Sequence, residues 1–358
     1  MLVVSSSSWC GVCGPEGLGR GDSMRAWIVE EQRPIAERPL RFVDLPAPVA
    51  EGTQVRIRVV ACGLCRTDGH IAEGDLPLHR RPTIPGHQVV GVVDQVGAQV
   101  TMHQVGSRVG VAWIGGACGS CRECRSDREN YCPQFQGTGW HLAGGYAEYM
   151  AVEERYVYSL GDLAMEDAQA APLMCPGTTG YAALRMAGVD RGDRLGLFGF
   201  GPTAFYVLRM ARSLGVEVLV STRGQARREL AVKEGASWAG STDRDRIPDG
   251  LDAAIVFPAA GSLAERALAA VRPGGVVVSA AIAMPGFEIR DYRSNFWGRD
   301  FRTLYNVRPT DAQGVIRQAR SIDLAMPVRV IQPEQVQEAL QRVLAGDQPE
   351  LATVVRWP

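Results

Sequence analysis

The chain has 358 residues, of which 46% are hydrophobic and 22% are charged, and its formal net charge is -1. This composition is typical of a soluble globular protein, and the length favours two domains over one compact core. The near-zero charge excludes an overall attraction to nucleic acid or to an anionic membrane, and no apolar run approaches the roughly 20 residues of a membrane helix. We therefore expect a cytoplasmic protein with neither a nucleic-acid nor a membrane partner.

The first 23 residues are rich in serine and glycine and lack the periodicity of a helix or a strand. Such a segment has little apolar surface to bury, so we expect residues 1–23 to form a disordered extension. Cys10 and Cys13 lie in this extension, and we expect their CxxC spacing to have no function.

Between Met24 and about Met150 the sequence alternates short valine-rich runs, such as residues 55–60 and 89–93, with glycine and proline. Alternation with a period of two, interrupted by turn residues, is typical of β-strands. This part of the chain is therefore expected to form a β-rich domain, as a curled sheet or a partial barrel.

From about Pro172 the pattern changes to helices that alternate with short apolar strands. We expect a helix at 204–214 and strands at 195–198, 216–220, 253–257 and 276–279. Strands that alternate with helices indicate a parallel sheet built from βαβ units. After about Thr310, a helix-strand-helix-strand segment ends in a strand around 353–356.

A glycine-rich turn joins the expected strand at 195–198 to the expected helix. It contains a GxGxxA pattern formed by Gly199, Gly201 and Ala204. Between a strand and a helix, this pattern is typical of a dinucleotide site, because the glycines permit a tight turn and close approach of a pyrophosphate to the helix N-terminus. Pro202 suits the first helical turn. We assign the three pattern residues to cofactor binding; the alternative is a glycine-rich turn without a ligand.

An NAD-specific site should carry an acidic residue about 20 residues later, where it binds the ribose hydroxyls. Here Thr222 aligns with the acidic position and Arg223 follows it. No carboxylate at that point repels a 2′-phosphate, and the arginine can pair with one. We therefore expect NADP(H) to be favoured over NAD(H). The alternative is that the arginines, with Arg227 and Arg228, form only a solvated helix start.

Four cysteines occur in a short polar segment, with the spacing C-x2-C-x2-C-x7-C. Zn²⁺ in a structural site takes four tetrahedral ligands, commonly all cysteines, and keeps no open position. A group of buried free thiols and a nucleic-acid zinc ribbon are the alternatives, but ribbons usually pair two separated knuckles. We therefore predict a structural zinc site formed by Cys118, Cys121, Cys124 and Cys132.

Three further segments carry cysteine and histidine: GLCRTDGH at 63–70, PGHQ at 85–88 and CPGTTGY at 175–181. With these segments the chain from Met24 to its end resembles the zinc-containing medium-chain alcohol dehydrogenases. The four-cysteine segment and GGYAEY at 144–149 also match that family. The resemblance implies an α/β fold, a homodimer or homotetramer, and two domains. These are a GroES-like β-rich catalytic domain (24–172 and 312–358) and a Rossmann domain with a doubly wound parallel sheet (173–311).

The resemblance implies that Cys65, His87 and Cys175 bind a catalytic zinc ion and leave a fourth position open for substrate or water. With the four-cysteine site, this gives two zinc ions per chain. It also implies that Asp68 holds the ring of His87 in position. At such a zinc ion an alcohol is easier to deprotonate and a carbonyl is more electrophilic.

Other residues near these ligands also match family positions. The resemblance assigns Thr67 and His70 to a relay that passes the alcohol proton to solvent, a step that histidine can perform at neutral pH. It assigns Arg66 to a phosphate of the cofactor and Trp113 to the substrate pocket. The alternatives are an ordinary surface histidine and a tryptophan of the plain core. We expect Cys62 to be a small buried hydrophobic residue and not a ligand.

One position departs from the family pattern. The family usually has Gly-His-Glu, whereas this chain has Gly-His-Gln at 86–88. The family glutamate lies behind the zinc ion and can approach it during ligand exchange. Gln88 makes the site one negative charge less anionic, so we expect a stronger Lewis acid and slower ligand exchange.

The activity implied is hydride transfer between a nicotinamide cofactor and a small primary alcohol or aldehyde bound at zinc. Related polyol, cinnamyl-type and formaldehyde-processing dehydrogenases are alternatives within the same family. An alternative of another class is a zinc- and nucleotide-binding redox sensor without catalysis, against which the intact set of ligand and relay residues argues.

Overall fold

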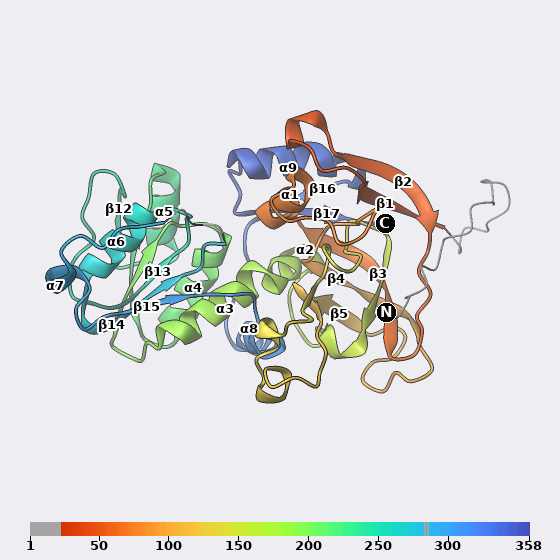
Figure 1. The fold of residues 1–358 in the computed structure, drawn as a ribbon, viewed down its shortest axis with the longest axis horizontal. Helices are drawn as coiled ribbons and strands as arrows, with labels where there is room; N and C mark the ends of the chain where they lie inside the picture. The colour runs from red at the N-terminus through yellow and green to blue at the C-terminus, as the bar shows by residue number, and fades with distance from the viewer. Residues whose placement is uncertain (1–22, 283, 285) are drawn as a thin grey trace, which may run out of the picture.

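The computed structural model describes residues 23–282, 284 and 286–358 (Figure 1). The expected N-terminal extension, with Cys10 and Cys13, lies outside the described residues except for Ser23, which begins the first strand. The chain forms two bodies side by side. Both ends of the described chain lie in one body, and the middle of the chain forms the other.

The first body is β-rich. Its strands are β1 (Ser23–Val29), β2 (Leu40–Pro46), β3 (Gln54–Gly63), β4 (Val89–Val96), β5 (Arg108–Val111), β6 (Ile114–Gly116), β7 (Gln136–Gly137), β8 (Tyr149–Glu153), β9 (Val157–Ser159), β16 (Val328–Ile331) and β17 (Ala352–Arg356). A seven-stranded sheet has the order β16-β17-β3-β4-β5-β9, with β8 also paired to β3. Its pairs are antiparallel except for β16 with β17. Two-stranded sheets of β1 with β2 and of β6 with β7 complete this body.

The second body contains a parallel sheet. Its strands are β10 (Arg194–Phe198), β11 (Glu217–Ser221), β12 (Trp238–Gly240), β13 (Leu251–Val256), β14 (Val271–Ser279) and β15 (Asp300–Thr303). Their order is β12-β11-β10-β13-β14-β15, and every neighbouring pair is parallel. The order reverses between β10 and β13, as in a doubly wound Rossmann sheet, and ligands of such sheets bind at this point. The predicted fold class is confirmed.

Helices cover both bodies. They are α1 (Arg66–Glu73), α2 (Asp167–Ala170), α3 (Pro176–Ala187), α4 (Pro202–Ser213), α5 (Gln225–Lys233), α6 (Gly261–Ala270), α7 (Tyr292–Asn295), α8 (Pro309–Ser321) and α9 (Val336–Ala345). Pro202 occupies the first turn of α4, where a missing N–H costs no hydrogen bond. Helix α3 packs against both α4 and α8 and lies between the two bodies (Figure 1).

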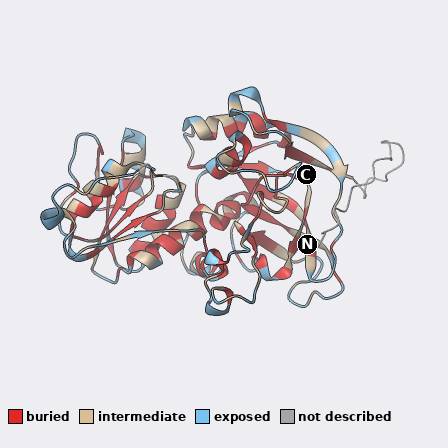
Figure 2. Cartoon of the chain, in the orientation of Figure 1, coloured by how far each residue is buried: buried red, intermediate tan, exposed pale blue. Residues whose placement is uncertain are grey.

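Burial follows the expected sequence patterns (Figure 2). In β3, Val55, Ile57 and Val59 are fully buried and alternate with partly exposed residues. In β10, by contrast, consecutive residues 195–198 are buried, because helices cover both faces of a parallel sheet. These two kinds of strand supply the cores of the two bodies.

Several element boundaries differ from those predicted. Helix α4 begins at Pro202, two residues before the expected start, and β11 lies one residue later than expected. Strand β14 begins at Val271 because it pairs with Leu251 before a register shift, which a count of apolar residues does not show. The expected domain limits after residues 172 and 311 fall inside the 3-10 helix at Ala171–Met174 and inside α8.

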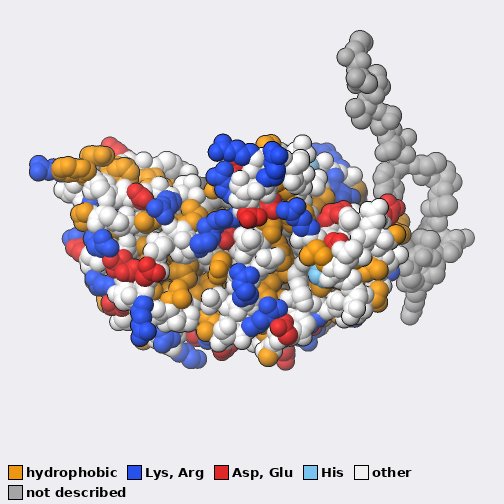
Figure 3. All heavy atoms as spheres, turned by 90° about the horizontal axis from the view of Figure 1, so that it is seen from below, with side chains coloured by type: hydrophobic (Ala, Val, Ile, Leu, Met, Phe, Trp, Pro, Cys, Tyr) orange, Lys and Arg blue, Asp and Glu red, His pale blue; other side chains and the backbone are white. Residues whose placement is uncertain are grey.

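The surface carries charges of both signs. Figure 3 shows basic and acidic side chains interspersed over one face, without a region of a single sign. Within the ranges that the structure describes, no helix is long and apolar enough to cross a membrane.

Candidate active site and metal centres

Three potential metal ligands from distant segments converge on one point. Cys65 follows β3 and precedes α1, His87 lies just before β4, and Cys175 precedes α3. Their sulfur and ring-nitrogen atoms all lie within 4.8 Å of one another. Two thiolate sulfurs and one imidazole nitrogen form a donor set that Zn²⁺ favours in catalytic sites, with one coordination position left open. The residues present therefore fit the predicted metal.

Asp68 lies behind this cluster and is fully buried. Its Oδ1 atom accepts hydrogen bonds from the backbone N–H of Gly86 at 3.1 Å and from Nδ1 of His87 at 3.0 Å. Its Oδ2 atom accepts from the backbone N–H of Cys65 at 2.9 Å and from the hydroxyl of Tyr146 at 2.8 Å. The bond to Nδ1 leaves Nε2 of His87 available to a metal.

The protonation states of the cluster are coupled before any cation binds. A hydrogen bond from Cys175 lowers the pKa of Cys65 against the effect of burial, whereas that bond and burial raise the pKa of Cys175. Burial lowers the pKa of His87, but the charge and hydrogen bond of Asp68, together with Cys65, outweigh it and raise the pKa to about 10. A metal ion needs deprotonated ligands, so its binding displaces protons from this cluster.

The predicted relay residues lie on α1. Thr67 is buried, and its hydroxyl oxygen accepts a hydrogen bond from Sγ of Cys65 at 3.6 Å. His70 lies one turn later and is partly exposed, with Nδ1 2.7 Å from a carboxylate oxygen of Asp75. Within the described part of the chain, no hydrogen bond joins the side chains of Thr67 and His70 directly. The structure therefore places the two residues at the inner and outer ends of one helix face.

Two further family positions have clear neighbours. Arg66 donates hydrogen bonds to the backbone oxygens of Val343 and Leu344, at the end of α9. The ring of Trp113 stands edge-on to that of His87, with centroids 5.1 Å apart and an interplanar angle of 79°. Trp113 thus lies next to the ligand cluster and not deep in the core.

Gln88 and Cys62 pack together behind the cluster without joining it. Gln88 is buried, and its side chain lies over Gly63, where an added Cβ would come within 2.5 Å of the amide oxygen. Cys62 is fully buried within the hydrophobic core, and burial raises the pKa of its thiol. The expectation that Cys62 is a small buried hydrophobic residue is confirmed.

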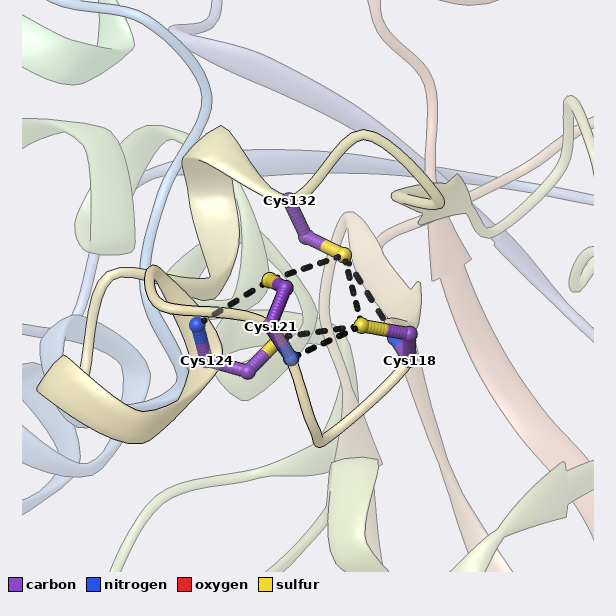
Figure 4. A group of neighbouring side chains, drawn as sticks. All are labelled: Cys118, Cys121, Cys124 and Cys132. Atoms are coloured by element: carbon purple, nitrogen blue, oxygen red, sulfur yellow. Dashed lines mark hydrogen bonds between the residues drawn. The ribbon is translucent and has the colours of Figure 1, made fainter.

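The four predicted structural ligands, Cys118, Cys121, Cys124 and Cys132, form a second cluster (Figure 4). Three of their sulfur pairs are 3.5, 3.8 and 3.9 Å apart. A tetrahedron of sulfurs about 2.3 Å from a central zinc ion has edges of about 3.8 Å, so the arrangement fits the ion.

The segment that carries these four cysteines, residues 118–132, is called the four-cysteine lobe below. Its backbone N–H groups also favour the thiolate form of the cysteines. The N–H of Cys121 donates to Sγ of Cys118 at 3.4 Å, and the N–H of Gln134 donates to Sγ of Cys132 at 3.3 Å. Backbone N–H groups of Ser120 and Cys121 lower the pKa of Cys118 to about 6. The thiolate is the form that binds a metal.

The glycine-rich turn lies at the carboxyl end of β10, beside the reversal of strand order. Gly199 has a φ of 90° and would bring a Cβ within 2.9 Å of Pro258, so only glycine fits. Gly201 caps α4 and has open space around it. Ala204 is buried in the first turn of α4. This placement is the one that a dinucleotide pyrophosphate requires.

The residues predicted to select the cofactor follow β11, the strand next to this turn. Thr222 is buried, and Arg223 is exposed with its side chain towards solvent. Arg228 donates to the backbone oxygen of Thr222 at 3.2 Å and so supports the loop. Arg227 instead reaches the other body, where its Nη2 donates to the backbone oxygens of Gln348 and Glu350 at 2.5 and 3.3 Å. Its Nη1 is buried without a partner among the described residues.

Comparison with known proteins agrees with this geometry. Residues 51–162 match the family model described as the alcohol dehydrogenase GroES-like domain. Over 297 residues the chain is 39% identical to a probable alcohol dehydrogenase AdhA of Mycobacterium tuberculosis (strain CDC 1551 / Oshkosh), covering 81% of this chain and 85% of that protein. The chain belongs to the zinc-containing medium-chain alcohol dehydrogenase family.

Further relatives place this dehydrogenase within the family. It is 34% identical over 275 residues to an alcohol dehydrogenase of Geobacillus stearothermophilus, covering 74% of this chain and 79% of that protein. A solved cinnamyl alcohol dehydrogenase from Sorghum bicolor superimposes with a TM-score of 0.83 at 26% identity, covering 93% of this chain and 97% of that one. The dehydrogenase is therefore an oxidoreductase of the alcohol dehydrogenase type.

Sequence reasoning missed several residues around the site. Tyr146 belongs to the recognised 144–149 segment, but nothing in that pattern indicated that its hydroxyl would reach Asp68. Trp140 stacks nearly parallel to Trp113, with centroids 5.9 Å apart, and contacts the stacked rings of His79 and His141. These rings come from three separate loops, which carry His79, Trp113 and Trp140 with His141, and they show no periodicity, so only the folded chain brings them together.

Proposed function

We propose that this dehydrogenase transfers a hydride between NADP(H) and a primary alcohol or aldehyde whose oxygen lies beside the Cys65–His87–Cys175 cluster. The observation that carries the proposal is the convergence of these three ligands within 4.8 Å, with the carboxylate of Asp68 behind them. A binding protein without catalysis would need neither an open coordination position nor a hydroxyl beside it. Thr67 supplies that hydroxyl.

Zn²⁺ held by the three residues would polarise the oxygen of the alcohol or aldehyde and so favour loss of the alcohol proton or attack on the carbonyl carbon. Asp68 fixes the orientation of His87 and compensates part of the positive charge. The four-cysteine lobe would hold a second zinc ion with a structural role, because its four ligands leave no open position.

The proton of the alcohol leaves along α1 in this proposal. The hydroxyl of Thr67 lies in the buried part of the site, and His70 lies one turn further towards solvent beside Asp75. A histidine in partial contact with water can exchange a proton with solvent at neutral pH. The step from Thr67 to His70 needs a bridging group, for which a cofactor hydroxyl or a water molecule is suitable.

The cofactor is proposed to lie along the carboxyl edge of the parallel sheet, with its pyrophosphate at Gly199, Gly201 and Ala204. The preference for NADP(H) rests on Thr222 and Arg223, since the loop after β11 offers a hydroxyl and a guanidinium where an NAD-specific site has a carboxylate. Arg66 is proposed as a second phosphate contact. It can release its two backbone partners on α9 when an anion is present.

The domain ranges and the oligomeric state of the protein are also proposed. Residues 24–172 and 312–358 form the catalytic domain, residues 173–311 form the cofactor domain, and the protein functions as a homodimer or homotetramer. Small alcohols and aldehydes are its partners.

The test is the initial rate of NADPH and of NADH oxidation by purified zinc-replete protein, with benzaldehyde as substrate and then a panel of aliphatic, cinnamyl-type and polyol-derived aldehydes. We expect turnover with NADPH well above turnover with NADH. Faster turnover with NADH would retain the enzyme and overturn the cofactor assignment. Absence of turnover across the whole panel would contradict the proposed function.

A further inference from the structure

Asn306 connects the cofactor-binding body to the substrate side of the active site. It lies between β15 and α8, and its Oδ1 accepts a hydrogen bond from the indole Nε1 of Trp113 at 3.0 Å. An indole N–H can only donate, so this contact fixes which end of the amide faces the tryptophan. Trp113 is the residue whose ring stands edge-on to His87.

The backbone at Asn306 is adapted to this contact. Its φ of 52° lies in the left-handed region, which asparagine tolerates better than most residues other than glycine. In this conformation the amide reaches Trp113. A glycine at this position would keep the backbone path while removing the side chain.

The other side of the Asn306 loop is held by the four-cysteine lobe. Asn130 lies between the ligands Cys124 and Cys132, is buried, and donates from Nδ2 to the backbone oxygen of Tyr305 at 2.9 Å. In return, Nδ2 of Asn306 donates to the backbone oxygen of Asn130 at 3.4 Å. The rings of Tyr131 and Tyr305 stack over the same contact, with centroids 5.8 Å apart.

We propose that Asn306 is a positioning residue that holds Trp113 against the substrate, and that the four-cysteine lobe sets the position of Asn306 through Asn130. The four-cysteine lobe then shapes the substrate site in addition to stabilising the fold. This inference rests on the proposed function, because it assumes that the alcohol or aldehyde chain lies beside the Cys65–His87–Cys175 cluster.

Loss of the Asn306 contact should weaken the binding of large substrates more than that of small ones. Without Oδ1 of Asn306 the indole N–H of Trp113 loses its partner, and the ring can leave the orientation in which it faces His87. A bulky aldehyde that packs on the indole then binds more weakly, whereas a small one that reaches only the ligand cluster is affected less. The effect falls on KM more than on kcat, since the ring contacts the substrate and takes no part in hydride transfer.

The experiment compares Asn306→Gly with Asn306→Asp, using benzaldehyde and acetaldehyde as probes. Aspartate keeps an oxygen for the indole and tolerates the left-handed backbone, but it loses the 3.4 Å donation to the backbone oxygen of Asn130, so its KM for benzaldehyde should lie closer to the wild-type value than that of Asn306→Gly. We expect Asn306→Gly to raise that KM by about 2- to 10-fold, the range for loss of one neutral hydrogen bond, with a smaller change for acetaldehyde. Asn295→Gly, at a partly exposed asparagine of α7 whose side chain donates to one backbone oxygen, is the matched control.

A second readout does not depend on activity. In ¹⁵N-labelled protein, the indole N–H resonance of Trp113 is assigned by its loss in Trp113→Phe. We expect it to exchange faster with solvent in Asn306→Gly and in Asn130→Ala, whereas Asn306→Asp should keep the indole N–H protected because an acceptor oxygen remains. In the Trp113→Phe background, Asn306→Gly should have no further effect on the KM for benzaldehyde.

The outcomes separate the two proposals. An unchanged indole resonance in Asn306→Gly, or a changed resonance with an unchanged KM for benzaldehyde, would overturn the positioning role. If the wild-type protein turns over no aldehyde, the proposed function fails, and a shifted resonance would then support the structural contact alone and overturn its catalytic consequence. If the indole resonance of Trp113 changes in Asn306→Gly but not in Asn130→Ala, the role assigned to the four-cysteine lobe would be overturned.

Discussion

The hydroxyl of Tyr146 donates a hydrogen bond of 2.8 Å to Oδ2 of Asp68, the carboxylate that also binds Nδ1 of His87. Both residues are fully buried. The carboxylate of Asp68 accepts hydrogen bonds from four donors, and the ring of His87 is the only basic side chain among them. Each donor therefore stabilises a buried negative charge. Tyr146 is thereby linked through Asp68 to His87, one of the three predicted ligands.

Replacing Tyr146 by phenylalanine should weaken both the fold and the metal site. A hydrogen bond to a buried charged group contributes about 1.5–3 kcal/mol, so the free energy of unfolding should fall by about that amount. Loss of a group that supports a ligand typically lowers metal affinity by about 10- to 100-fold. Denaturant titration and competition with a zinc chelator measure the two effects.

Tyr158 offers a matched control for this substitution. It is also buried, but its hydroxyl has no hydrogen-bond partner among the described residues. Tyr158→Phe should therefore leave zinc affinity unchanged and should not destabilise the protein. Equal effects of the two substitutions would contradict the role given to Tyr146.

Replacing Arg223 by alanine should reduce the use of NADPH without affecting NADH. Loss of a charge-assisted hydrogen bond to a phosphate should lower kcat/KM for NADPH by about 10- to 100-fold. Arg212→Ala is the control, because Arg212 lies at the far end of α4 and donates to the backbone oxygen of Glu234. A parallel loss with both cofactors would show that Arg223 does not recognise the 2′-phosphate.

Gln88→Glu tests the departure from the family pattern. Gln88 is buried next to His87, so a glutamate there adds a negative charge close to the ligand cluster. An added negative charge disfavours loss of the alcohol proton, so the acidic limb of the pH profile for alcohol oxidation should move to higher pH. Gln99→Glu, at an exposed position, is the control. If Gln88→Glu and wild type have superimposable pH profiles and equal turnover, the charge at position 88 does not affect loss of the alcohol proton, and the prediction is wrong.

His141 makes stability depend on pH. Burial, together with the charge of His79, lowers the pKa of His141 from 6.5 to about 4, and its Nδ1 accepts the backbone N–H of Gly137. The unfolded chain binds this proton more readily, so the contribution of His141 is complete above about pH 6.5 and is lost as the pH falls towards 4. NMR titration of the ring measures the pKa directly.

His79→Gln supplies the second arm of that measurement. Removing the charge of His79 should move the titration of His141 to higher pH and narrow the window over which stability is lost. An unchanged titration midpoint of His141 in His79→Gln would show that the stacked pair does not interact electrostatically.

The sequence was sufficient for the parts of the molecule that depend on local patterns. Apolar alternation located β3 and β4, and the glycine pattern after β10 located the tight turn together with the helix that follows it. The spacing of the four cysteines predicted a cluster that the fold brings together, because a ligand set within 15 residues needs only local chain geometry. The cysteines and histidine at 65, 87 and 175 required the family resemblance, since nothing local links these positions.

The remainder depends on contacts between distant segments. Tyr146 reaches Asp68 across 78 positions, and Trp113 reaches Asn306 across 193. Neither pair follows a helical or strand period, and each partner alone is a common core or loop residue. Arg227 is a further example. Its sequence context predicts a solvated position at the start of a helix, whereas in the structure it contacts the other body.

The central claim is that Cys65, His87 and Cys175 form a catalytic zinc site separate from the four-cysteine lobe. The most direct measurement is zinc content per chain together with turnover in Cys65→Ser, with Cys62→Ser as the control three residues away. We predict two zinc ions and activity for wild type and for Cys62→Ser, but one zinc ion and no turnover for Cys65→Ser. Full activity of Cys65→Ser with two zinc ions retained would contradict the account.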